Sequence, residues 1–444
     1  MNKKNAAFSI VVLTVFLAGC IPSQDATFED VKKWVKPGLE AAPISPAEIQ
    51  QGAQLLSKPL LEKPLTLDTA IQIALLNNKT LQAKYEDLWI AKASYTQAGT
   101  FSNPVFSGSV SFPSQGGSAK TELSIEQHFL DFFLVPLKGS ANDLQFENTK
   151  IEVAQSVLTL AFEVKSAYFE RVAAQQSLAM WQLVFNASEA AFELTRRQYK
   201  AGNISELQLR NEEAMFYQVK LDLAESKSRV NTSTEKLCRL LGVRKTLIRW
   251  NDAEKLPEIP PQEPGQNELE ALALTQRLDL IMLKQTLEIQ TKELAAVGWS
   301  GVSESKLGVK MESDSDGKSI GPTVEIPVPI FQSSQPIVAK QDALIRQSRY
   351  QIEAKESDIV SDVALAYEHL ASSRQKVQSI RKDILPLRTK LIGLTQQHYN
   401  YMLMDVFALL QAKQNEIQAQ QNYIEAMKEY WIARAELEKA TGSK

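Results

Sequence analysis

Long stretches of this sequence contain neither glycine nor proline. Both residues are absent from 140 to 201, and after Gly202 they are absent again from 203 to 241. At about 1.5 Å per residue, a helix over most of the first stretch is roughly 80 to 90 Å long. Compact domains rarely hold such helices, although 444 residues would ordinarily form two or three of them. We therefore predict a mainly α-helical chain built from very long helices, with a small β part.

The sequence also contains an internal repeat. Residues 198–242 align with residues 398–442 without a gap, so that Tyr199 matches Tyr399. A repeat of this kind means that one structural unit occurs twice. We predict a first repeat over 64–259, a proline-rich connector over 260–266 and a second repeat over 267–444.

Apolar residues near the end of each repeat keep a period of seven. A sustained heptad indicates coiled-coil packing of long helices against each other. The positions are Leu209, Phe216, Leu223, Val230 and Leu237 in the first repeat, and Leu409, Glu416, Tyr423, Tyr430 and Leu437 in the second.

Residues 105–129 and 306–330 alternate between apolar and polar side chains. Phe106 and Val110 share one face of the first segment, while Ser107 and Ser109 share the other. A turn rich in glycine and serine divides each segment, so each is predicted to form a β-hairpin. Four such strands fit a small soluble sandwich. They also fit a closed twelve-stranded membrane barrel if three chains contribute four strands each.

The N-terminus has the pattern of a secretory signal. A basic start precedes an apolar run over 6–17, and the order Leu-Ala-Gly-Cys ends at Cys20. This ending resembles the bacterial lipobox, which implies cleavage before Cys20 and lipidation of its thiol. Ile21, in place of aspartate, implies the outer membrane by analogy. We predict a signal peptide over 1–19 and a lipidated segment over 20–63.

No set of residues in the sequence indicates catalysis, a cofactor or a metal. Cys238 is the only cysteine besides Cys20 and fits a small core residue, and His128, His369 and His398 are far apart. The 49 basic and 52 acidic residues nearly balance, which argues against nucleic-acid binding. We therefore predict that the protein is not an enzyme.

Two repeats of helix, β-hairpin, very long helix and long helix, behind a lipobox, resemble the TolC-like family of outer-membrane efflux channels. The motifs that carry the resemblance lie at 65–78 (LTLDTAIQIALLNN), 198–205 (QYKAGNIS) and 321–331 (GPTVEIPVPIF). The resemblance implies a homotrimer with a twelve-stranded barrel in the outer-membrane lipid. It also implies an α-helical periplasmic tunnel that meets an adaptor protein and, through it, an inner-membrane pump.

In this family the motif Y-x-x-G-x-x-[ST] forms the tip of a helical hairpin, where the adaptor is contacted. Tyr199, Gly202 and Ser205 match the motif, with Asn203 inside the turn. Glycine favours the left-handed backbone of such a turn, and serine caps the returning helix. We expect a regular glycine turn near residue 202.

The second copy departs from this motif. Tyr399 and Asp405 fit, but Met402 stands at the glycine position. We expect this turn to be built differently, with Asn400 supplying the unusual backbone angle. Met402 and Met404 favour apolar contacts with the adaptor, although their thioethers would also suit Cu(I).

The resemblance also indicates candidates for the periplasmic aperture. In family members, acidic residues three and six positions after the capping residue surround this entrance. The corresponding residues here are Gln208, Asn211, Ala408 and Gln411. We expect a neutral constriction with weak cation preference, unless Asp405 or Glu206 supplies the charge.

These features predict an outer-membrane exit channel that passively conducts the substrates of a tripartite efflux system, such as heavy metals or drugs. Two alternatives remain open at this point. One is a structural periplasmic coiled-coil lipoprotein without a pore, and the other is the channel of a type I protein secretion system.

Overall fold

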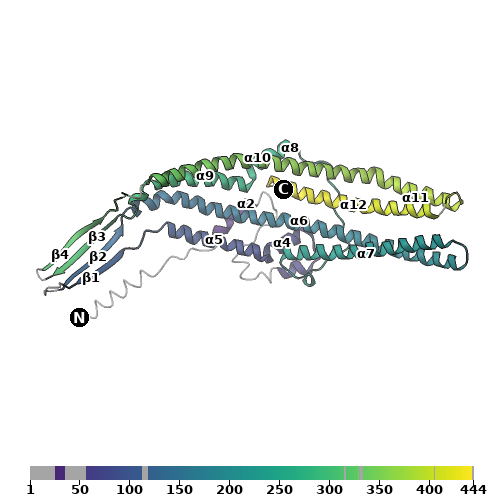
Figure 1. Cartoon of the computed structure of the whole chain (residues 1–444), viewed down its shortest axis with the longest axis horizontal. Coiled ribbons are helices and arrows are strands. Elements are labelled where there is room, and N and C mark those ends of the chain that lie inside the picture. Colours follow the sequence, from purple (N-terminus) through teal and green to yellow (C-terminus); the bar gives the residue numbers. More distant parts are fainter. Residues whose placement is uncertain are drawn as a thin grey trace. The chain divides into compact units, whose positions relative to one another are not determined.

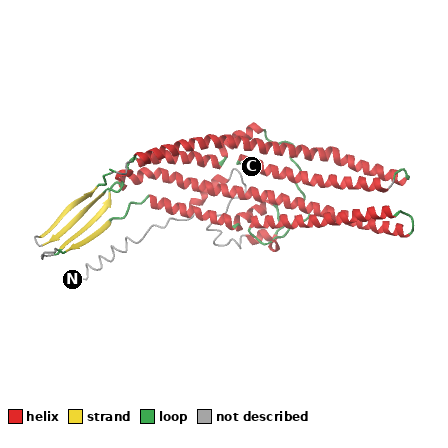
Figure 2. Ribbon diagram, in the orientation of Figure 1, coloured by secondary structure: helices red, strands yellow, loops and turns green. Residues whose placement is uncertain are grey.

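The computed structural model describes residues 26–35, 57–112, 119–314, 317–328, 330, 334–404 and 406–442. Most of them are helical (Figure 2). The predicted signal peptide, Cys20 and Asp405 lie outside these ranges. Within the ranges, no helix is both long enough and apolar enough to cross a membrane.

The same order of elements occurs twice along the chain (Figure 1). After an N-terminal helix α2 (Ala26–Val35), the first copy comprises α4 (Leu67–Asn77), α5 (Lys79–Ala98), β1 (Val105–Ser111), β2 (Lys120–His128), α6 (Asp131–Lys200) and α7 (Glu206–Leu241). The second copy comprises α8 (Gln266–Gln276), α9 (Leu278–Val297), β3 (Lys306–Asp314), β4 (Gly317–Glu325), α10 (Gln335–Ser379), the π-helical turn η3 (Ile380–Ile384), α11 (Leu385–Asn400) and α12 (Val406–Thr441). This order confirms the predicted mainly α fold with two repeats and four strands.

The chain divides into two compact units. The first comprises residues 1–31, 86–151 and 282–351, and the second comprises 32–85, 152–281 and 352–444. All four strands belong to the first unit, and both helical hairpin tips belong to the second.

The four strands of the first unit form one antiparallel sheet in the order β1-β2-β3-β4. The central pair, β2 and β3, joins the two hairpins, with Ile125 opposite Val309. Because successive residues point to opposite faces, the predicted alternation produces one apolar and one polar face. The apolar face is uncovered, as shown by the exposed fractions of 67% for Phe106 and 72% for Ile320.

The second hairpin is shorter than predicted. The alternating pattern suggested a strand reaching residue 330, but β4 ends at Glu325. Pro327 has no N–H group to donate to a ladder, so the apolar residues that follow Glu325 do not continue the strand. Pro322 is tolerated within β4 because this strand lies at an edge of the sheet.

In the second unit, each repeat has a joint where two short helices meet the end of a long one. Asn78 ends α4, and its side-chain amide donates to the Leu240 carbonyl oxygen over 2.8 Å. Arg277 ends α8 and donates to the Ala440 carbonyl oxygen over 3.5 Å. Gly242 packs closely here, since a Cβ atom on it would lie 2.5 Å from the Asn77 carbonyl oxygen.

Most buried side chains of α7 recur at steps of three, four or seven residues, which agrees with the predicted seven-residue period. Coiled-coil packing between helices stays a prediction. The buried residues of α7 are Leu209, Glu212, Val219, Leu223, Ser226, Ser233, Thr234, Leu237, Cys238 and Leu241.

The long helices of the two repeats differ. In the first copy, α6 runs without interruption for 70 residues. In the second, the turn η3 separates α10 from α11, and Leu385 donates its N–H to the Ile380 carbonyl oxygen. Pro386 follows directly and lacks the N–H that an α-helix would direct to residue 382. This turn was not among the elements predicted from the sequence.

The connector between the repeats is held against the second repeat by side chains. Arg374 donates to Glu263 over 3.2 Å and to the carbonyl oxygens of Pro260 and Pro261. Tyr430 also donates to Glu263. Nearby, Arg381 of η3 pairs with Glu258 over 3.1 Å, and Trp431 donates to the Pro257 carbonyl oxygen over 2.9 Å. We call residues 257–263 with these partners the connector clasp.

Candidate functional site: the two hairpin tips

The first tip joins α6 to α7 through a left-handed glycine. Gly202 has φ of 74° and donates its N–H to the Tyr199 carbonyl oxygen over 2.9 Å. Asn203 donates its N–H to the Gln198 carbonyl oxygen, also over 2.9 Å. These two bonds satisfy the last carbonyls of α6, as a Schellman-type helix end does. The predicted glycine turn is present at this tip.

A capping box begins the returning helix α7. The Gln208 N–H donates to Ser205 Oγ over 3.3 Å, and the Ser205 N–H donates to Gln208 Oε1 over 2.9 Å. This reciprocal arrangement satisfies two N–H groups that the first turn of a helix leaves unpaired. Ser205 is therefore the predicted cap, and Gln208 is engaged in capping as well.

The second tip repeats the backbone geometry of the first, so the expected difference in construction was wrong. Met402 itself is left-handed, with φ of 57°, whereas Asn400 is the last residue of α11. Met402 donates to the Tyr399 carbonyl oxygen and Leu403 donates to the His398 carbonyl oxygen, each over 2.9 Å. The two hydrogen bonds fix the turn although a methionine occupies the glycine position.

The two tips differ in surface chemistry rather than in backbone. Met402 is 94% exposed, and Tyr401, Leu403 and Met404 are exposed beside it. At the first tip the matching positions are Ala201, Gly202, Asn203 and Ile204. The second tip therefore exposes more apolar side chains than the first. Single exposed apolar residues are common on protein surfaces, but four consecutive ones indicate an interaction site.

The structure places the four aperture candidates in different surroundings. Gln208 is half-buried by its capping role, and Asn211 is exposed one turn further along α7. On α12, Ala408 is half-buried, while Gln411 is exposed and donates to Asn415 over 3.5 Å. No charged group stands at any of these four positions, and their role at an aperture stays a prediction.

Glu206, a candidate substitute for the missing acidic residues, has a charge partner. Arg210 donates to Glu206 over 3.3 Å and to Glu213 over 2.8 Å. All of these side chains belong to the first two turns of α7. The arginine therefore compensates part of the negative charge near the first tip.

Glu212 is a buried carboxyl group that was not predicted from the sequence. Only 4% of this residue is exposed, and burial raises the pKa of its carboxyl group. Glu212 lies three residues after Leu209, so the heptad pattern itself assigns it to the buried stripe of α7. A carboxylate at a buried position of the seven-residue pattern is the feature of the sequence that could have indicated it. The next turns along α7 and α6 hold stacked rings, with Phe192 and Phe216 centroids 5.3 Å apart.

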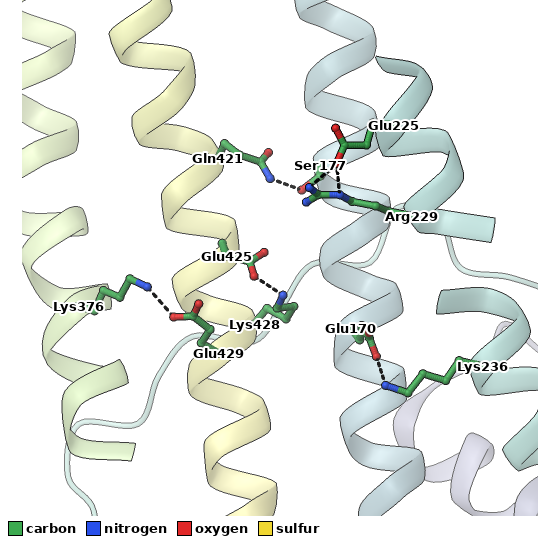
Figure 3. A network of polar contacts seen from close by, with 10 residues as sticks. All are labelled: Glu170, Ser177, Glu225, Arg229, Lys236, Lys376, Gln421, Glu425, Lys428 and Glu429. Atoms are coloured by element: carbon green, nitrogen blue, oxygen red, sulfur yellow. Dashed lines mark hydrogen bonds and ion pairs between the residues drawn. The ribbon is translucent and has the colours of Figure 1, made fainter. Parts of the chain in front are cut away.

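Further from the tips, polar contacts tie the helices of the second unit together (Figure 3). Lys236 of α7 donates to Glu170 of α6 over 2.5 Å, and Lys376 of α10 donates to Glu429 of α12 over 2.7 Å. Gln421 of α12 donates to Ser177 of α6 over 3.3 Å, which connects the two repeats. Across the described ranges, no three His, Cys, Asp or Glu side chains are grouped as metal ligands.

Comparison with known proteins places this architecture. The family described as "Outer membrane efflux protein" matches residues 70–243 and 276–443. The chain belongs to the outer membrane efflux protein family. The two matched segments correspond to the two repeats, and membership confirms the predicted efflux class and outer-membrane location. The members are passive channels rather than enzymes.

Individual members are similar to this chain over most of its length. The cobalt-zinc-cadmium resistance protein CzcC of Cupriavidus metallidurans is 23% identical over 356 residues, which cover 76% of this chain and 82% of CzcC. The outer-membrane channel OprN is 15% identical with a TM-score of 0.72, covering 94% of this chain and 96% of OprN. The Campylobacter jejuni CmeC channel is 15% identical with a TM-score of 0.72, covering 85% of each chain.

Proposed function

We propose that three copies of this chain form the outer-membrane exit duct of a tripartite efflux system. Each copy contributes four strands to a twelve-stranded barrel and its long helices to a periplasmic tunnel. The duct is passive, and an inner-membrane pump reaches it through a periplasmic adaptor that contacts the hairpin tips.

The observation that carries this proposal is the four-stranded sheet. Its edge strands, β1 and β4, each have one side without a partner among the described strands, and one face of the sheet is apolar and exposed. In hydrocarbon, open edges leave N–H and C=O groups unsatisfied, so the sheet requires further strands on both sides. Copies of the same chain supply them, with β4 of one beside β1 of the next.

The second tip supports the adaptor contact. Tyr401, Met402, Leu403 and Met404 expose apolar surface at a turn where helix packing does not require it. Methionine adapts its shape to irregular partner surfaces. The same adaptor contact also includes Tyr199, Asn203 and Ser205 at the first tip, and Asp405 at the second.

We include two further elements in the proposal. Cys20 carries the lipid that anchors residues 20–63 to the membrane. Heavy-metal cations are the first cargo to test, because the relative CzcC is named for cobalt, zinc and cadmium resistance. Drugs are the second, since specificity in such systems resides mainly in the pump.

Cysteine crosslinking in intact cells tests the barrel. Neighbouring strands lie about 4.8 Å apart, and a disulfide needs Cα atoms within about 7 Å. Ser109 of β1 and Thr323 of β4 are on the polar face, at the two edges of the sheet. We expect Ser109→Cys with Thr323→Cys, or with cysteine at Ser319 or Gly321, to give covalent dimers and trimers.

The matched control combines Ser109→Cys with Lys310→Cys. In this pair the second cysteine is on the central strand β3, which β2 separates from β1 within one sheet. It should give no covalent trimer. If every edge pair behaves like the control, and the purified protein shows no discrete conductance steps in planar bilayers, the duct is excluded.

A further inference from the structure

A closed group of four charged side chains occupies the polar face of the sheet. It consists of Lys120 and Glu122 from β2 and Lys310 and Glu312 from β3, and we call it the charge band. Lys120 lies 3.1 Å from Glu122 and 3.4 Å from Glu312. Lys310 lies 3.0 Å from Glu122 and 2.8 Å from Glu312. Each lysine therefore contacts both glutamates, and each glutamate contacts both lysines.

Strand register explains why the group closes. Glu122 and Glu312 are directly opposite each other in the β2–β3 ladder. Like charges at opposite positions repel. Lys120 and Lys310 are each two residues away from a glutamate on their own strand, hence on the same face, and reach both carboxylates. The band thus joins the first repeat to the second with no net charge.

The band faces away from the apolar side of the sheet. In the two central strands the even-numbered residues share the polar face, whereas Leu123, Ile125, Val309 and Met311 share the other. The band side chains keep between 30% and 40% of their surface exposed. In the proposed barrel the apolar face meets lipid, so the band lines the lumen.

We propose that the charge band keeps its own level of the barrel lumen indifferent to the sign of a passing ion's charge, with Lys120 and Lys310 as the residues that maintain this. Glu126 is on the same face but four residues away from Glu122 along β2. The inference rests on the proposed trimeric duct. Rings of unbalanced charged side chains make a pore selective. Here three neutral bands would form the ring. Opposite charges within a band are about 3 Å apart, much less than the Debye length of about 8 Å, so their electrostatic fields largely cancel at longer range.

Reversal potentials in a potassium chloride gradient across a planar bilayer test the inference. Removing both lysines, in Lys120→Gln with Lys310→Gln, leaves two negative charges per chain. This variant should raise the ratio of potassium to chloride permeability by roughly threefold or more, because a potential of the order of kT acts oppositely on the two ions. Glu122→Gln with Glu312→Gln should shift the ratio toward chloride by a similar factor.

Two matched controls separate charge balance from other effects. Lys318→Gln removes a lysine from β4 on the opposite face, since Lys318 pairs with Ser313 in the ladder. The reversed band, Lys120→Glu, Glu122→Lys, Lys310→Glu and Glu312→Lys, changes all four residues but stays neutral. Both controls should keep the wild-type reversal potential and the same trimer in detergent.

The outcomes are distinct. If the double lysine variant conducts with the reversal potential of Lys318→Gln, the charge band does not set selectivity and the inference is wrong. If the reversed band shifts the potential as strongly as the double lysine variant does, charge compensation is not the cause, and the inference is again wrong. Wild-type protein without conductance would overturn the duct itself.

Discussion

The N–H of Met402 donates to the carbonyl oxygen of Tyr399 over 2.9 Å, the same bond at the same distance that joins Gly202 to Tyr199. Two turns in the two repeats therefore share one backbone although their central residues differ. A left-handed backbone costs a residue with a Cβ atom about 1 to 2 kcal/mol. Since Met402 is almost fully exposed, packing of its side chain does not offset that cost.

Replacing Met402 with glycine should stabilise the second tip. Met402→Gly removes the Cβ strain, and we expect the free energy of unfolding to rise by about 1 kcal/mol. Thermal unfolding followed by circular dichroism measures the change. Met402→Ala is the matched control, because it removes the side chain but keeps a Cβ atom. An equal gain from alanine would show that the strain is not the cause.

Apolar character at the second tip should matter more than sulfur. Met402→Leu with Met404→Leu should retain adaptor crosslinking and leave copper tolerance unchanged in a strain that depends on this duct. Met402→Ser with Met404→Ser should reduce crosslinking about tenfold. A tenfold loss of affinity corresponds to about 1.4 kcal/mol, which is less than the free energy gained by fully burying two methionine side chains. Copper sensitivity in the leucine variant alone would indicate metal handling by the thioethers.

Glu212 should make stability depend on pH. Burial raises the pKa of its carboxyl group in the folded chain, so the folded state binds its proton more tightly than the unfolded state does. The protonated Glu212 therefore contributes to the free energy of unfolding, fully below the ordinary glutamate pKa of about 4.3. This contribution is lost as the pH rises through the raised pKa of the folded state.

Glu212→Gln should remove this part of the pH profile and be at least as stable as wild type at neutral pH. Unfolding curves recorded between acidic and neutral pH check this. Glu206→Gln, an exposed change on the same helix, should leave the profile unchanged. A steeper loss of stability with rising pH in Glu212→Gln would contradict the assignment.

The connector clasp contains a mostly buried pair and an exposed pair, which should differ in worth. Glu263→Gln leaves Arg374 without its carboxylate partner. The site is mostly buried, since 17% of the Arg374 side chain and 11% of the Glu263 side chain are exposed. We expect a loss of about 2 kcal/mol in unfolding free energy. Glu258→Gln, whose partner Arg381 is exposed, should have little effect. Equal losses would mean that burial does not decide the effect.

Lipidation has a direct biochemical test. Cys20→Ala should abolish labelling of the chain by radioactive palmitate, because no other cysteine lies near the predicted cleavage site. Cys238→Ala is the control and should retain the label, since Cys238 is buried. Label that persists in Cys20→Ala would exclude this anchor.

Local patterns in the sequence predicted most of the fold. The repeat, the alternation around Phe106 and Val309, and the heptad through Leu209 and Leu237 depend on spacing alone, so they could be read without coordinates. The end of the second hairpin was predicted less well. The apolar and polar residues continue to alternate after Glu325, but Pro327 has no N–H group with which to continue the ladder.

The remaining features depend on tertiary context. Glycine is not required at the second tip, because two backbone hydrogen bonds hold Met402 in a conformation that residue type alone argues against. The ion pairs of Glu263 and the closure of the charge band join residues far apart in sequence. The π turn before Pro386 was not predicted, because the repeat alone does not show where a helix is interrupted.

The π turn before Pro386 has a consequence for exchanging the two repeats. Such a turn holds one residue more than an α-helical turn, so side chains after it are rotated by about 100° relative to an uninterrupted helix. The exposed leucines of α11, Leu387, Leu391 and Leu394, all follow this turn. A chimera that replaced α10, η3 and α11 with the continuous helix α6 would lack this turn, so the long helices of the two repeats are not equivalent segments.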